Sequence, residues 1–110
     1  MTRIWQTLAM AAIVALLGLH CGQSADRTTQ IQQVVQMQED GRFRDAISSL
    51  REMLDENPDD PELNHLYGLS LLSTGRPALA VWSLRKASEN EEFAVRDGLL
   101  LSRALMRGGS

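Results

Sequence analysis

The sequence predicts an all-α fold, and three observations support that prediction. The segments that begin at Gly41 and Gly75 share six residues when one is shifted by 34 positions along the chain. In each segment, apolar residues then recur at the three- and four-residue spacing of a helix. No stretch alternates apolar and polar residues for long enough to indicate a strand. A repeat of this length is typical of helical hairpins, which bury their apolar faces only when neighbouring hairpins stack on them.

The N-terminus predicts an export signal that precedes the fold. Arg3 supplies a positive charge, and residues 8–19 form an unbroken run of apolar residues and glycine. That run is short for a helix that spans a bilayer, but it has the length of a secretory signal core. We therefore assign residues 1–20 to a signal peptide and residues 21–26 to a short polar tether.

Cys21, the single cysteine of the chain, follows this apolar run almost at once. Its position resembles that of the lipidated cysteine in bacterial lipoprotein signals, although His20 stands where that family has a small residue. The resemblance implies an exported protein of a bacterial envelope, either membrane-attached through Cys21 or periplasmic. An ordinary signal peptide cut nearby and an uncleaved anchor are the alternatives.

The first two helices are expected at residues 27–39 and 43–56. The first carries a weak apolar pattern around Val34. It should end before Gly41, because helix ends commonly adopt a left-handed conformation that glycine tolerates. The second helix should place Leu50 against its neighbour, on the same face as the small residue four positions earlier.

The third helix, residues 61–73, has three local signals at its start. Pro58 ends the preceding helix, because the residue before a proline avoids helical geometry. Asp60 can accept a hydrogen bond from a free N–H group of the new helix, and Pro61 suits the first helical position.

The last two helices are expected at residues 77–90 and 95–107. Pro77 opens the fourth helix in the same way as the proline of the third. The fifth helix is apolar on more than one face. A helix of that kind expects cover on both sides, so we expect it to expose an apolar strip and to self-associate or bind another chain.

This pattern resembles the tetratricopeptide repeat family, with Gly68, Ala80 and Ala87 at positions where that family has small residues. The resemblance implies antiparallel helix–turn–helix units that stack as a short right-handed α-solenoid. Glu92 stands where the second unit would usually have a proline. The implied units are residues 27–60, residues 61–94 and a first helix of an incomplete third unit within residues 95–110.

The resemblance also implies a partner-binding site on the concave face, lined by the first helix of each unit. Three arginines at the implied positions recur at i, i+7 and i+11 and form one basic stripe. That stripe would suit an amphipathic or carboxylate-bearing peptide, and an ordinary solvated helix face is the alternative. The implied residues are Ile31, Val35, Gln38, Glu62, His65, Leu69, Leu72, Arg96, Leu99, Arg103, Met106 and Arg107.

Charge and motifs favour a binding protein over an enzyme or a nucleic-acid-binding protein. The chain has 11 basic and 14 acidic residues, and removing residues 1–20 removes one arginine, which leaves a net charge of −4. An acidic surface is a poor match for nucleic acid. His65 has no second histidine or cysteine spaced to form a metal site, and we expect it to be a partly exposed packing residue. No catalytic motif is present, and we expect no cofactor.

Trp82 falls at a repeat position that usually faces outward in the tetratricopeptide family. It is expected either to anchor a partner or the membrane interface, or to lie flat on its own helix over Ala78 or Lys86.

Together these features predict a protein–protein interaction scaffold of the bacterial cell envelope. Two other functions stay open. In the first, the chain is the N-terminal piece of a longer protein, and the activity, such as that of a peptidase or glycosyltransferase, lies beyond residue 110. Alternatively, it would be a self-associating helical module that forms a homo-oligomer through the fifth helix.

Overall fold

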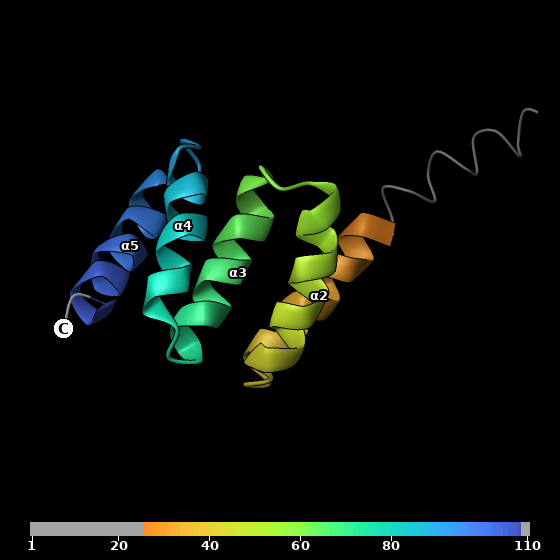
Figure 1. The fold of residues 1–110 in the computed structure, drawn as a ribbon. Helices are drawn as coiled ribbons and strands as arrows, with labels where there is room; N and C mark the ends of the chain where they lie inside the picture. The colour runs from red at the N-terminus through yellow and green to blue at the C-terminus, as the bar shows by residue number, and fades with distance from the viewer. Residues whose placement is uncertain (1–25, 109–110) are drawn as a thin grey trace, which may run out of the picture. The chain divides into compact units, whose positions relative to one another are not determined.

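The computed structural model describes residues 26–108, which form helices joined by short turns and contain no strand (Figure 1). The all-α prediction is therefore confirmed. The expected signal peptide and Cys21 lie outside the described residues. The helices are residues 26–39, α2 (Phe43–Glu56), α3 (Pro61–Ser73), α4 (Pro77–Ser88) and α5 (Ala94–Gly108).

The expected helix ends lie within one residue of the observed ones except at α4, which ends at Ser88, two residues before the expected end. The backbone N–H groups of Glu89 and Asn90 donate three residues back, to the carbonyl oxygens of Lys86 and Ala87. The helix therefore tightens into a turn at its end. The side chain of Asn90 also accepts a hydrogen bond from the N–H of Glu92 at 2.9 Å, which holds the turn that leads into α5.

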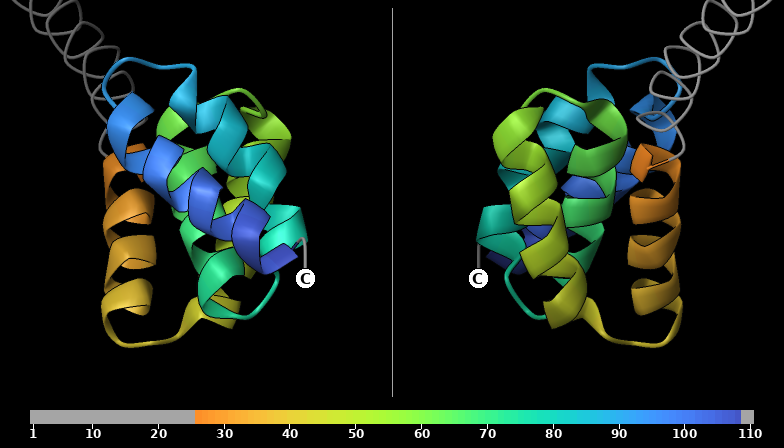
Figure 2. Two further views of the ribbon diagram at one scale, coloured as in Figure 1. Left: turned by 90° about the vertical axis from the view of Figure 1, so that its left-hand side faces the viewer. Right: turned by 90° about the vertical axis from the view of Figure 1, so that its right-hand side faces the viewer.

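The described chain divides into two compact units, one reaching to Gln33 and one starting at Val34. In the second unit, α2, α3, α4 and α5 stand side by side in chain order (Figure 1). Each helix packs on the next, and α5 also contacts α3. The left view of Figure 2 looks onto α5, whose outer side has no neighbouring helix within the second unit.

The two glycine turns repeat the same geometry 34 residues apart. Gly41 has φ +77° and Gly75 has φ +74°, which is the left-handed conformation that their position predicts. In the first turn, the Arg42 N–H donates to the carbonyl oxygen of Met37 at 2.7 Å. The equivalent bond in the second turn, from Arg76 to Leu71, measures 2.8 Å. Both turns thus end a helix with a hydrogen bond that reaches back five residues.

Equivalent positions of the repeat are also buried alike. Ala46 and Ala80 are fully buried, as are Leu50 and Leu84. Each fully buried leucine stabilises the fold by about 1.5–3 kcal/mol relative to an exposed one. Gly68 of α3 faces Leu84, since a Cβ atom built on Gly68 would lie 2.5 Å from Leu84 Cδ2. The small residues therefore allow the close packing of α3 on α4.

The start of α3 has the predicted cap. The Asp60 side chain accepts a hydrogen bond from the Leu63 N–H at 3.1 Å, and Pro61 occupies the first turn. Asn64, one turn into the helix, donates to the carbonyl oxygens of Pro58 at 3.0 Å and Asp60 at 2.9 Å. The turn between α2 and α3 is therefore fixed by side chains as well as by backbone hydrogen bonds.

Candidate protein-binding surface

The outer side of α5 carries large apolar side chains that the fold leaves uncovered. Val95, Leu99 and Met106 keep 80%, 70% and 73% of their surface exposed. They recur at i, i+4 and i+11, so they share one side of the helix. The opposite side is the packed one, where Asp97 and Ala104, seven residues apart, are fully buried. The expectation that this helix exposes an apolar strip is confirmed.

The three predicted arginines of α5 border this strip. Arg96, Arg103 and Arg107 are all exposed, and their i, i+7, i+11 spacing places them together on one flank. A partner that lies along α5 would therefore meet apolar side chains and positive charge at once. We call this surface the α5 outer face, and it consists of Val95, Arg96, Leu99, Arg103, Met106 and Arg107.

The corresponding residues of α3 are less accessible. Glu62 and Leu69 lie 34 residues before Arg96 and Arg103, at the equivalent repeat positions. Both are half-buried, whereas the two arginines are exposed. His65 and Leu72 each keep 6% of their surface, so they do not lie on an open groove wall as expected. The reason is that α3 packs against α2, α4 and α5, which leaves it little free surface.

The predicted residues that precede α2 also take part in packing. Gln38 donates to the carbonyl oxygen of Leu66 and to Ser70 Oγ, both at 2.9 Å, and thereby joins the end of the 26–39 helix to α3. Val35 is half-buried. Ile31 is half-buried as well, and it belongs to the first compact unit. Of the predicted set, only the α5 residues therefore form an open surface within the second unit.

A buried polar contact fixes α5 against α3. His65 Nδ1 lies 2.6 Å from Asp97 Oδ1, and the imidazole stacks on Phe93 with ring centroids 5.5 Å apart. His65 is therefore neither alone nor partly exposed, contrary to the expectation. The second oxygen, Asp97 Oδ2, is buried without a hydrogen-bond partner. This contact holds the Asp97 side of α5 inward, against α3.

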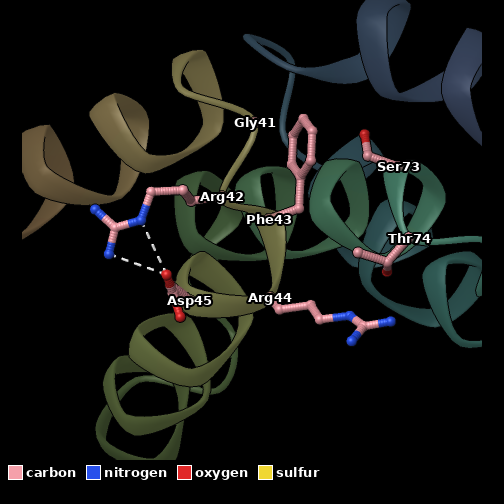
Figure 3. A pocket seen from close by; sticks show the side chains of 7 residues that line it. All are labelled: Gly41, Arg42, Phe43, Arg44, Asp45, Ser73 and Thr74. Carbon is pink, nitrogen blue, oxygen red and sulfur yellow. Dashed lines mark hydrogen bonds and ion pairs between the residues drawn. The ribbon is translucent and has the colours of Figure 1, made fainter.

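A separate hollow of about 530 Å³ lies beside the first glycine turn (Figure 3). Arg42 is bound to Asp45 there, with an Nη2–Oδ2 distance of 2.9 Å. The Arg44 side chain extends away from that pair. Both arginines are exposed, so neither is held as a buried charge that would select a ligand. The residues that line the hollow are Gly41, Arg42, Phe43, Arg44, Asp45, Ser73 and Thr74.

Three further findings bear on function. Within residues 26–108, no three His, Cys, Asp or Glu side chains gather closely enough to hold a metal ion. In the same range, no helix has the length and apolar composition that crossing a membrane requires. The chain matches no protein-family model, no curated protein and no solved structure.

Proposed function

We propose that this chain is a tetratricopeptide-type scaffold that binds an acidic, amphipathic helix or peptide on the α5 outer face. The observation behind this proposal is the exposure of Leu99 and Met106 beside three arginines on a helix that the core holds in place. Monomeric proteins rarely leave large apolar side chains together on a surface unless they are used in binding.

The repeat supports the scaffold part of the proposal. Positions 34 residues apart have the same left-handed glycines, the same turn hydrogen bonds and the same full burial of alanine and leucine. In arrays of this kind, each unit contacts its neighbours and binding surfaces are formed by successive helices. The His65–Asp97 contact adds a specific link between the first helices of two successive units.

The charge of the α5 outer face defines the chemistry of the partner. Three guanidinium groups on one flank favour carboxylates, which they can bind through two parallel hydrogen bonds. The apolar side chains on the neighbouring strip favour leucine-like residues at helical spacing. A partner helix with an acidic flank and an apolar face satisfies both requirements.

The cellular place of this scaffold is part of the same proposal. The apolar N-terminal run followed by Cys21 supports export and attachment to a bacterial envelope membrane through a lipid. A short polar segment would then separate the lipid from the helices. The partner would be another envelope protein.

The proposal is tested by capture from envelope extracts with the parent chain and two variants. Leu99→Glu places a carboxylate in the α5 outer face and should abolish capture of the bound protein. Leu79→Glu is the matched control, because Leu79 lies on α4 and is also exposed, at 58%. A protein captured equally by the parent and both variants would show that the α5 outer face is not the binding surface.

A second candidate function is self-association through the same surface. The exposed apolar strip supports it as well, since two copies could cover each other's α5. The arginine flank opposes it, because two copies of the same flank would place like charges near each other. For this reason we favour an acidic partner over a second copy.

A further inference from the structure

A second cavity lies on a different part of the fold, among α2, α3 and α4. Its volume is about 290 Å³, and none of its lining residues comes from α5. Trp82 of α4 forms one wall and keeps 64% of its surface exposed. Leu54 of α2 and Tyr67 of α3 contribute further apolar surface, and Arg51 and Lys86 add positive charge.

Specific contacts hold these walls in place. Arg51 Nε donates to the Tyr67 hydroxyl at 3.2 Å, across α2 and α3. The Lys86 ammonium lies 5.5 Å from the centroid of the Trp82 ring and forms an ion pair with Asp59. The indole is therefore supported from one side by a cation, as expected for a tryptophan one helical turn away from a lysine. The cavity has ordered walls although much of the indole meets solvent.

The charges around the cavity suit a carboxylate near Arg51. The hydrogen bond that Arg51 donates to the Tyr67 hydroxyl raises the pKa of Arg51, which keeps the guanidinium charged. Among the described residues, Nε is the one nitrogen of this group with a hydrogen-bond partner, so the terminal nitrogens can receive a bidentate acceptor. Lys86 already has Asp59 as its partner. Arg51 is thus the group that can select an added negative charge.

We propose that this cavity binds a peptide segment that places an aromatic side chain against Trp82 and Leu54 and a carboxylate on Arg51. Aromatic pairs contribute binding free energy beyond that of the area they bury, and tryptophan is a frequent anchor at interfaces. This is a second binding surface, independent of the α5 outer face. It would let the scaffold hold two partners at once.

An anionic membrane is the less suitable occupant. Asp55 lines the cavity and Asp59 stands beside it, with 83% of its side chain exposed. A membrane surface would place many acidic head groups against both carboxylates, whereas a single ligand carboxylate needs to meet only Arg51. A concave surface also fits an inserted side chain better than a lipid bilayer surface.

The test titrates the ¹⁵N-labelled full chain with N-acetyl-L-phenylalanine and measures binding by NMR, from the Trp82 indole N–H and the backbone amides of the cavity residues. In the Trp82→Ala variant, the backbone amides alone report binding. The matched probe is N-acetyl-L-phenylalaninamide, which has the ring but no charge. We expect the amide to bind about fivefold more weakly, the upper range for an exposed ion pair. Arg51→Gln should remove that difference, while Trp82→Ala should abolish binding of both probes.

Arg44→Gln is the control variant, since Arg44 is an exposed arginine on the same helix outside the cavity. It should change neither affinity. Equal binding of the acid and the amide, or an unchanged preference in Arg51→Gln, would overturn the proposal. A Trp82 signal that responds to phosphatidylglycerol vesicles but to neither probe would overturn it too, in favour of a membrane contact. Loss of binding in Leu99→Glu would instead show that the two surfaces are not independent.

Discussion

Gly68 illustrates how one missing side chain sets the packing of two helices. An alanine Cβ at this position would lie 2.5 Å from Leu84 Cδ2 and 2.6 Å from Leu84 Cγ, and Leu84 is fully buried. We therefore expect Gly68→Ala to lower the free energy of unfolding by about 1–3 kcal/mol through overpacking. Urea unfolding followed by circular dichroism measures this.

Gly98 provides the control for that substitution. It also lies inside a helix, but nothing stands within 4 Å of a Cβ built on it. Gly98→Ala should raise the free energy of unfolding by about 0.4–1 kcal/mol, because alanine restricts the unfolded chain. Equal effects of the two substitutions would mean that helix propensity, and not contact with Leu84, decides the role of Gly68.

The His65–Asp97 pair makes a second prediction at the residue scale. Asp97→Leu removes the acceptor from a buried imidazole and leaves a polar group unsatisfied, which is costly. In the double variant His65→Leu, Asp97→Leu neither polar group remains. We expect the double variant to be less destabilised than the sum of the single variants by about 1–3 kcal/mol, measured by urea unfolding. Additive effects would show that the two side chains do not interact energetically.

Residues differ in how well the sequence predicts their role. Gly41 and Gly75 could be predicted, because the left-handed turn at a helix end is a local property. The partner of His65 could not, since the contact spans 32 residues and depends on how α3 and α5 pack. A signal was nevertheless present: Asp97 lies seven residues before Ala104, so the two share the buried side of α5.

At the scale of elements, α5 makes the sharpest prediction about solution behaviour. If its outer face binds a second copy, the chain should sediment as a concentration-dependent oligomer, and Met106→Glu should return it to a monomer. If an acidic partner is the natural occupant, as we favour, the parent should stay largely monomeric, because the arginine flanks repel each other. Sedimentation velocity over a range of concentrations separates these outcomes, with Leu79→Glu as the control.

The elements themselves were largely predictable. Helix starts at Pro61 and Pro77 matched, because a proline at the first helical position determines them locally, and at α3 the Asp60 cap adds to it. The prediction that His65 and Leu72 of α3 line an open groove was wrong. Repeat position alone does not say how much of a helix its neighbours cover, and α3 is covered on most sides. The cavity beside Trp82 was also missed, since it combines side chains from three helices.

At the scale of the whole molecule, the N-terminus should decide where the protein resides. If Cys21 carries a lipid, Cys21→Ser should release the protein from the membrane fraction and abolish labelling with a fatty-acid probe. Fractionation of cell envelopes with the parent and the serine variant measures both effects. A parent that takes no label and fractionates like the variant would contradict lipid attachment.

The stacking of α2 to α5 makes a final prediction about cooperativity. Each helix in this row packs mainly on the next, so the α3–α4 contact holds the second hairpin together and connects α5, which packs on α4, to the helices before it. A repeat unit cannot bury its apolar face alone, so weakening this contact should open α4 and α5 together with α3. Gly68→Ala weakens that contact. We expect it to speed amide hydrogen exchange in α5 as well as in α3, by about 5- to 150-fold, the equivalent of 1–3 kcal/mol. Faster exchange confined to α3, with α5 unchanged, would show that α4 and α5 hold together without α3.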